Sequence, residues 1–144
     1  MFLLLGVLSA LFERSQSGKG QVVDAAMVDG VPAMMGLIHS WFAQQSWTNQ
    51  RENNLLDGAA PFYRCYETAD EKFISVGPLE PHFFTELVKL SGLDEAEINT
   101  QYQQEKWPDK RDTYQAIFNT KTREQWMQIF EGTDACVAPV LDFV

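Results

Sequence analysis

Residues 72–84 read KFISVGPLEPHFF, and this stretch decides the fold class because it passes from a strand to a helix. Polar and apolar residues alternate over 72–76, which is typical of a half-buried strand. A Gly-Pro turn follows, and Pro81 then stands where proline is favoured, in the first turn of a helix. Gly92 is a stop signal for that helix. The stretch therefore predicts a strand followed by a helix over 81–91, within an α+β fold.

The segment before this strand is also rich in strand formers. Residues 62–67 read FYRCYE, and the turn-like residues 68–71 separate them from the strand over 72–76, so we expect a β-hairpin. The expected elements further along the chain are helices over 94–104, 109–119 and 123–130, the last lying between Thr122 as its cap and Gly132 as its stop, and a strand or extended segment over 136–141.

The N-terminal third is dominated by apolar residues. Residues 1–12 read MFLLLGVLSALF, without the basic start of a signal peptide and shorter than the roughly 20 residues of a membrane span. We expect a buried helix over 2–15 and, because a domain seldom begins on its most buried helix, further sequence upstream. An apolar stripe predicts a long helix over 24–45, kinked near Pro32, which lacks a backbone donor. A polar segment over 46–60 is expected to be an extended linker.

The composition of the chain bounds its function. Its 144 residues suffice for one domain or slightly more, and 45% of them are hydrophobic, enough to bury a core. The formal net charge is −9 and the basic residues form no run, which argues against a nucleic-acid surface. Cys65 and Cys136 form no CxxC motif and have no histidine at metal spacing. We therefore expect two buried thiols and no zinc site.

Glu80 is the acidic residue with the most constrained setting, between the Gly-Pro turn and Pro81. A carboxylate at this position can cap the helix, because it faces free backbone N–H groups and the positive end of the helix dipole. It can also act as a general base, provided that a substrate proton comes within hydrogen-bonding reach. From position alone, the cap is the more frequent role.

Other side chains are candidates for ligand binding. Met27 and Met34 can line an adaptable surface for an acyl chain, or can simply pack against another helix. Tyr63 can belong to the core of the hairpin or can direct its hydroxyl to a ligand. His39 and His82 have no serine, cysteine or aspartate partner at a telling spacing. We therefore expect ordinary packed or solvent-exposed histidines.

Four segments carry a family resemblance: GKGQVVDAAM at 18–27, NLLDGAAPFY at 54–63, GPLEPHFF at 77–84 and GTDACVAPVL at 132–141. The first is similar to the GxGQxVDxxM segment of the class III CoA-transferase superfamily. The other three resemble the α-methylacyl-CoA racemase branch of that superfamily. The resemblance extends over nearly the whole chain and rests on several separate motifs.

The resemblance implies a fold and an assembly. Members are interlocked homodimers in which each subunit has a large Rossmann-like domain, a linker and a small α+β domain. On this basis, residues 1–22 are the last helix of the large domain, residues 23–60 are a linker with a long helix, and residues 61–144 are the small α+β domain. The chain would then be a fragment of a class III CoA-transferase fold that lacks the Rossmann-like half.

The resemblance also implies a reaction: interconversion of (2R)- and (2S)-2-methylacyl-CoA by 1,1-proton transfer at the α-carbon. Glu80 matches the family's glutamate on one face of the substrate, and a histidine–aspartate pair from the missing half serves the other. Met27, Met34, Tyr63 and Leu79 correspond to the substrate site. The CoA thioester is itself the substrate, so no separate cofactor and no metal are expected. The isolated chain is expected to be inactive.

Two other functions stay open from the sequence. A CoA-transferase of the same superfamily would carry its nucleophilic aspartate upstream, and Glu80 would then be structural. A non-catalytic α+β interaction module would use the methionine stripe to bind a partner. Neither nucleic acid nor a membrane is an expected partner, and the expected location is the cytoplasm, or mitochondria or peroxisomes in a eukaryote.

Overall fold

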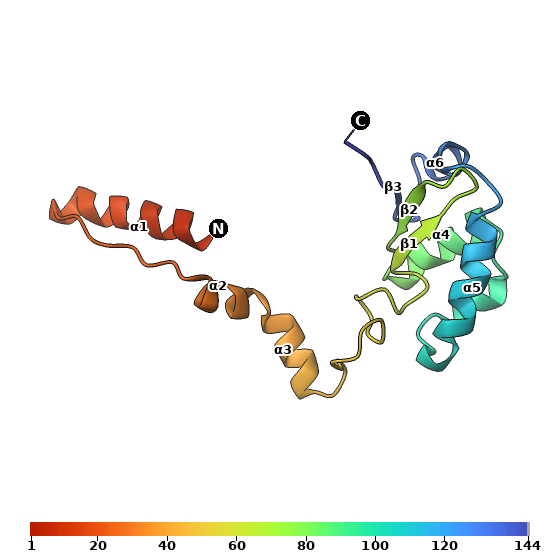
Figure 1. Cartoon of the computed structure of the whole chain (residues 1–144), viewed down its shortest axis with the longest axis horizontal. Helices are drawn as coiled ribbons and strands as arrows, with labels where there is room; N and C mark the ends of the chain where they lie inside the picture. Colours follow the sequence, from red (N-terminus) through yellow and green to blue (C-terminus); the bar gives the residue numbers. More distant parts are fainter. Residues whose placement is uncertain (144) are drawn as a thin grey trace. The chain divides into compact units, whose positions relative to one another are not determined.

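The computed structural model describes residues 1–143, which form two compact units (Figure 1). The first unit is Met1–Trp47, and the second begins at Thr48. The first is helical and the second combines helices with a small sheet. This arrangement of elements confirms the α+β class expected from residues 72–84.

Helix α1 (Phe2–Ser17) opens the first unit and is two residues longer than expected. It ends at Gly18, whose φ of 74° lies in the left-handed region that favours glycine. No residue of α1 is buried, and Leu4 and Phe12 are 65% and 74% exposed. The helix is not buried within this chain, because its own unit covers too little of an all-apolar surface, and its burial by further sequence stays a prediction. No helix within residues 1–143 combines the length and the apolar character needed to cross a membrane.

Two helices replace the single long helix expected over 24–45. Helix α2 (Met27–Met34) and helix α3 (Gly36–Ala43) are separated at Met35, whose φ and ψ of −84° and 9° leave the helical region. The Met35 N–H donates to the carbonyls of both Val31 and Pro32 at 3.1 Å. Because Pro32 and Gly36 are poor helix formers, the interruption falls between them and not at the proline itself.

The second unit begins with hydrogen-bonded turns, so residues 48–60 are not an extended linker. Asn54 is 3% exposed, accepts the Thr48 N–H at 2.7 Å and donates to Asp57 Oδ2 at 2.7 Å. Burial would raise the pKa of Asp57, but the hydrogen bonds from Asn54, Asn53 and Ala59 outweigh it and lower that pKa. Ala59 and Ala60 are buried in the core.

A three-stranded antiparallel sheet follows, in the order β1-β2-β3 (Figure 1). Strands β1 (Arg64–Glu67) and β2 (Phe73–Val76) are the expected hairpin, and β3 (Val137–Pro139) lies within the extended segment expected over 136–141. Gln115 covers the open edge of β1, because its side-chain amide bonds both the N–H and the carbonyl of Glu67. The other edge strand contains Pro139, which has no N–H.

The helices α4 (Pro81–Ser91), α5 (Trp107–Phe118) and α6 (Arg123–Phe130) belong to this unit. Helix α5 lies next to β1, and α6 lies next to β3. Helix α4 confirms the helix expected over 81–91, and α6 confirms the helix expected after Thr122. The helix expected over 94–104 is instead two short 3-10 helices, because the chain turns at Gln101–Gln103. The helical elements are α4 (Pro81–Ser91), η1 (Glu95–Thr100), η2 (Gln104–Lys106), α5 (Trp107–Phe118) and α6 (Arg123–Phe130).

The core lies between the inner face of the sheet and these helices and is largely aromatic. Tyr66 from β1 packs on Phe118 with ring centroids 5.0 Å apart, and Phe118 meets Trp126 edge-on at 5.3 Å. All three side chains are at most 1% exposed. Alternation along β1 and β2 then turns Cys65 and Ser75 to the outer face of the sheet. This outer face is where the candidate site lies.

Candidate active site around Glu80

A four-residue loop, Gly77–Glu80, joins β2 to α4 and places Glu80 at the N-cap position of that helix. The Gly77 N–H donates to the carbonyl of Cys136 at 3.0 Å, and the Leu79 N–H donates back to the Gly77 carbonyl at 2.9 Å. Glu80 itself is extended, with φ −73° and ψ 141°, as expected for a residue that precedes a proline. The loop is therefore short, turned back on itself and fixed to the segment before β3.

The side chain of Glu80 is not used for capping. It is exposed and makes no hydrogen bond to the N-terminus of α4, although the Glu80 carbonyl accepts the Phe84 N–H at 3.0 Å. Within the described residues, it also takes no part in an ion pair. The role that position alone favours is thus not the one this carboxylate fills, and both of its oxygens are free to meet a ligand.

A cavity of about 450 Å³ opens on the outer face of the sheet, next to this loop. Tyr63 is half-buried in its wall, and a Cβ placed on Gly77 would lie 3.9 Å from Tyr63 Cε2 and 3.8 Å from the Cys136 carbonyl. The structure thus brings Tyr63 to the loop that carries Glu80. The residues that line the cavity are Leu56, Gly58, Tyr63, Arg64, Cys65, Ser75, Val76, Gly77 and Cys136.

Cys136 reports on the charge around the cavity. Partial burial raises the pKa of its thiol, and the negative charges of Glu80, Asp134 and Glu86 raise it further. The thiol therefore stays protonated at neutral pH and is a poor nucleophile. Its φ of 52° lies in a region that is costly for a residue other than glycine, and strain of this kind gathers at functional sites.

Both thiols are exposed, so the expectation of two buried cysteines is wrong. Cys65 points to the outer face of β1 because its neighbour Tyr66 takes the inner one. Cys136 lies in the turn just before β3. The sequence pattern alone does not say which face of a strand is covered.

Arg64 is a site residue that the sequence argument missed. It is the one charged residue that lines the cavity. Its Nη1 donates to the Gly58 carbonyl at 3.1 Å and its guanidinium lies 5.7 Å from the ring of Tyr66. Its Nε is buried and has no hydrogen-bond partner among the described residues. Arg64 alternates with Cys65 and lies over Tyr66, so it lines this cavity and also a neighbouring cavity that Asp109 and Asp112 line.

The other predicted site residues lie elsewhere. Leu79 is half-buried against the core and does not line the cavity. Met27 and Met34 belong to α2 in the first unit and are 83% and 67% exposed. Their roles in substrate binding stay predictions. His39 and His82 are exposed, as expected, and no cluster of metal-binding side chains occurs in the described part of the chain.

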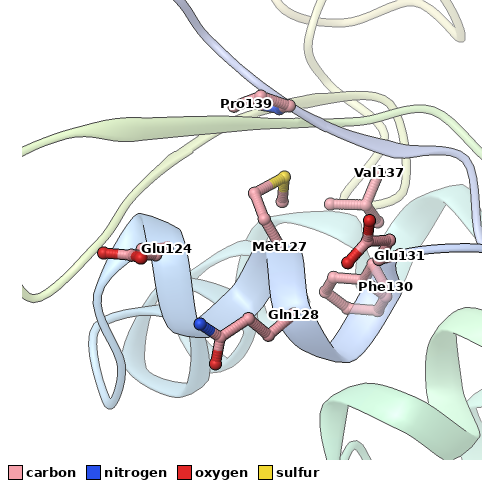
Figure 2. Close-up of a pocket in the computed structure, with 7 residues that line it drawn as sticks. All are labelled: Glu124, Met127, Gln128, Phe130, Glu131, Val137 and Pro139. Atoms are coloured by element: carbon pink, nitrogen blue, oxygen red, sulfur yellow. The ribbon is translucent and has the colours of Figure 1, made fainter.

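A second cavity, of about 370 Å³, lies between α6 and β3 (Figure 2). Met127, Phe130, Val137 and Pro139 supply its apolar lining and Glu124, Gln128 and Glu131 its polar lining, with Glu131 beside Phe130 and Val137 in Figure 2. None of the predicted site residues lines it. It is therefore separate from the arrangement around Glu80.

Comparison with known proteins places the chain in a family. The profile of CoA-transferase family III matches residues 1–144. The alpha-methylacyl-CoA racemases of Mus musculus and Homo sapiens are each 44% identical to the chain over 139 residues. A CaiB/baiF CoA-transferase family protein of Caenorhabditis elegans is 35% identical over 139 residues. The matches to the two racemases cover 96% of this chain but only 36% of each racemase, so the chain spans about a third of their length.

Solved structures support the same fold. Crystal structures of Rv3272 from Mycobacterium tuberculosis superpose with TM-scores of 0.69 and 0.61 and cover 96% of this chain. The match covers 36% and 37% of those chains, at 17% and 18% sequence identity, which shows the fold alone. The full-length family match and the two racemases at 44% identity decide the assignment. The chain belongs to CoA-transferase family III.

Proposed function

We propose that this chain is part of an α-methylacyl-CoA racemase, an enzyme that interconverts (2R)- and (2S)-2-methylacyl-CoA. In this proposal the chain contributes the catalytic glutamate, Glu80. The observation that carries the proposal is the unbonded carboxylate of Glu80 at the end of a fixed loop, whose first residue, Gly77, lines an open cavity. The 44% identity to two alpha-methylacyl-CoA racemases supports the choice of reaction.

The chemistry requires a group on each face of the substrate. The α-proton of a thioester is a weak acid, so its removal needs a positioned base and stabilisation of the negative charge that develops on the carbonyl oxygen. A carboxylate that removes the proton from one face cannot return it to the other. In the proposal Glu80 serves one face, and a histidine–aspartate pair in the rest of a complete racemase serves the opposite face.

The remaining residues are assigned to binding. Tyr63 lines the cavity beside the loop, and Leu79, which packs against the core next to Glu80, is assigned to substrate binding. Met27 and Met34 offer adaptable thioether side chains to the acyl chain. The acyl-CoA thioester is the substrate, and the reaction needs no further cofactor. We assign the complete enzyme to a homodimer in the cytoplasm, or in mitochondria or peroxisomes of a eukaryote.

A CoA-transferase is the second candidate, and one observation favours it. The succinyl-CoA–D-citramalate CoA-transferase of Chloroflexus aurantiacus is 35% identical over 94 residues, which cover 65% of this chain. In a transferase the attacking carboxylate would come from another part of the protein. Glu80 would then have no role in the reaction.

The test is Glu80→Gln in a complete protein that contains these residues, assayed with a 2-methylacyl-CoA in ²H₂O. Loss of a general acid–base group lowers the rate about 10²- to 10⁴-fold, so both racemisation and α-deuteration from one enantiomer should fall by that factor. Glu105→Gln is the matched control, because Glu105 is an exposed glutamate with no ion pair in the described residues. Full racemisation in Glu80→Gln would refute the proposal. Transfer of CoA between carboxylic acids, unchanged by Glu80→Gln, would favour the second candidate.

A further inference from the structure

We propose that Gln101 and Tyr102 are positioning residues that fix the backbone of the loop before Glu80 and thereby the place from which the Glu80 side chain extends. The proposal rests on the proposed role of Glu80 in proton transfer. Both residues lie in the turn between η1 and η2, more than 20 positions away along the chain. Three hydrogen bonds cross from their side chains to the loop.

Gln101 provides two of these hydrogen bonds. Its side-chain Nε2 donates to the Pro78 carbonyl at 3.2 Å and to the Leu79 carbonyl at 2.9 Å. The residue is only 4% exposed, so its side-chain amide is shielded from water. An amide nitrogen has two N–H donors, and both are directed at consecutive carbonyls of the loop.

Tyr102 provides the third hydrogen bond, from its hydroxyl to the same Leu79 carbonyl. Its ring is steadied by an edge-on contact with buried Phe62, at 5.6 Å between centroids and 79° between planes. Burial raises the pKa of Tyr102, and the charge of Glu80 raises it further. The hydroxyl therefore keeps its proton and remains a donor at neutral pH. The effect of Glu80 on this pKa also indicates that its carboxylate lies near the Tyr102 hydroxyl.

The Leu79 carbonyl matters because of the peptide that it belongs to. The planar peptide Leu79–Glu80 ties the direction of that oxygen to the orientation of the Glu80 backbone. Pro81 restricts the other side of Glu80, whose ψ is 141°. Since the carboxylate makes no capping bond of its own, the backbone is what sets where the side chain leaves the chain.

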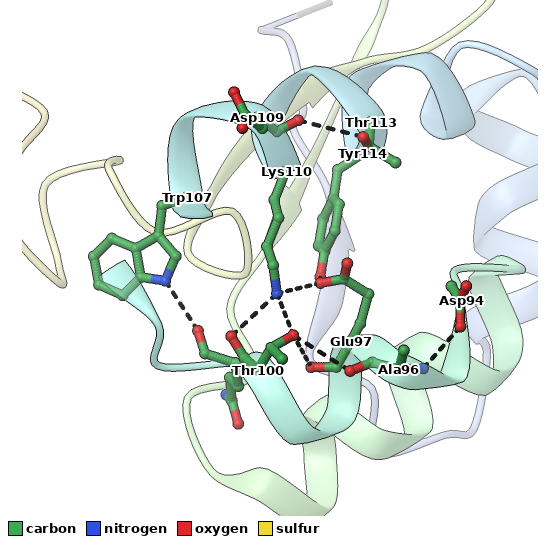
Figure 3. A network of polar contacts seen from close by, with 10 residues as sticks. Asp94, Ala96, Glu97, Thr100, Trp107, Asp109, Lys110, Thr113 and Tyr114 are labelled. Atoms are coloured by element: carbon green, nitrogen blue, oxygen red, sulfur yellow. Dashed lines mark hydrogen bonds and ion pairs between the residues drawn. The ribbon is translucent and has the colours of Figure 1, made fainter. Parts of the chain in front are cut away.

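The turn that bears the two side chains is itself anchored on α5 (Figure 3). Lys110 Nζ lies 2.5 Å from Glu97 Oε2 and donates to Thr100 Oγ1 at 2.6 Å and to the Thr100 carbonyl at 3.1 Å. Trp107 Nε1 donates to the Gln101 carbonyl at 2.9 Å. Side chains of α5 thus hold the consecutive carbonyls of Thr100 and Gln101. The Gln101 amide and the Tyr102 hydroxyl therefore extend from a fixed segment of backbone.

The alternative is that these bonds only satisfy buried carbonyls and stabilise the fold. The two explanations predict different effects on kcat, on KM and on the fraction of folded enzyme. A purely structural bond, when removed, lowers the fraction of folded enzyme and leaves the rate per folded molecule unchanged. A positioning bond lowers kcat of the folded enzyme and leaves KM nearly unchanged, because misplacement of a reacting group by about 1 Å can cost about 10²-fold in rate.

The test uses Gln101→Met and Tyr102→Phe in a complete enzyme, with Gln103→Met as control because Gln103 lies in the same turn and its side chain makes no hydrogen bond in the described residues. We expect kcat per folded molecule to fall about 10- to 100-fold in Gln101→Met and about 3- to 10-fold in Tyr102→Phe, with KM within about twofold of the parent. Gln103→Met should retain the parent values.

A second readout separates positioning from structure. In a Glu80→Asp background the carboxylate is already displaced, so Gln101→Met should reduce kcat by less than about threefold more. An equal reduction in both backgrounds, or unchanged kcat in both variants, would overturn the proposal even if Glu80→Gln is inactive. Activity that survives Glu80→Gln would instead overturn the proposed function. If Gln101→Met does not fold, Tyr102→Phe decides alone, since Tyr102 is 53% exposed and loses only its hydroxyl.

Discussion

The starts of α4 and α6 occupy the same kind of position but use their first residues differently. Thr122 at the start of α6 accepts the Gln125 N–H at 3.2 Å, and the Gln125 side chain accepts the Thr122 N–H at 2.9 Å. This reciprocal pair is a capping box. Glu80 at the start of α4 has a similar backbone conformation but makes no such bond.

This difference teaches how to recognise a side chain that is kept for a ligand. A capping oxygen from Ser, Thr, Asp or Asn at this position contributes about 1 kcal/mol to stability, and a glutamate, whose side chain is one methylene longer than that of aspartate, does not supply that gain. The fold restrains Glu80 by other means, through Pro81 and through the carbonyls of the loop. Residues that break a local rule in an otherwise well-satisfied structure are candidates for function.

The largest expected effect comes from making the start of α4 resemble the start of α6. Glu80→Thr in a complete enzyme places a capping hydroxyl beside the free N–H groups of α4. We expect a gain of up to about 1 kcal/mol in the free energy of unfolding and a loss of about 10² or more in racemisation rate. Urea denaturation and a racemisation assay on one preparation measure both quantities. A variant that keeps its activity would contradict the functional half of the comparison.

The reverse change at α6 should affect stability alone. Thr122→Ala removes the capping hydroxyl and should lower the free energy of unfolding by about 1 kcal/mol. Because α6 lies beside β3 and not at the Glu80 loop, kcat should stay within about twofold of the parent. A marked fall in kcat at an unchanged folded fraction would show that the two helix starts are not independent.

The smallest effect concerns acid. Asp70 Oδ1 accepts the Thr68 hydroxyl at 2.7 Å and the Arg123 N–H at 2.9 Å, and these hydrogen bonds lower the pKa of Asp70. A lowered folded-state pKa gives stability that is present above the unfolded value of about 3.9 and is lost as pH falls through the folded-state pKa. Asp70→Asn should therefore be less stable than the parent near pH 6, with the gap closing below pH 4. Urea midpoints between pH 6 and pH 3 measure this. If the difference in stability between the parent and Asp70→Asn stayed constant over this pH range, Asp70 would not contribute to the loss of stability in acid.

Elements with local signals were predictable from the sequence. The hairpin, α4 and α6 follow from alternation, Pro81 and Thr122, which act within a few residues. The prediction of a helix over 94–104 was wrong, because the periodicity of a sequence does not show which groups distant in the chain its side chains and carbonyls will bond. In the structure, the Pro78 and Leu79 carbonyls and the indole of Trp107 hold that segment in a turn.

Some residues of the candidate site were predictable from the sequence and others were not. Glu80 and Tyr63 stand in recognisable segments, and the structure places Tyr63 at the cavity next to the loop. Arg64 and Gln101 carry no local signal, since their relevance depends on a buried, unbonded Nε and on hydrogen bonds to residues more than 20 positions away. The environment of α1 was not predictable either. An apolar sequence indicates that the helix needs to be covered, but it does not indicate which part of a protein covers it.

The partly blocked edges of the small sheet have a consequence for how the protein behaves at high concentration. An exposed edge strand invites another copy to continue the sheet, which is a common route to aggregates. Here the amide of Gln115 occupies the backbone groups of Glu67 on one side, and Pro139 leaves no donor at its position on the other. Within the described residues, the backbone groups of Glu67 on one edge and the Pro139 position on the other are therefore unavailable for pairing with a neighbouring chain, while the outer face of the sheet carries the cavity.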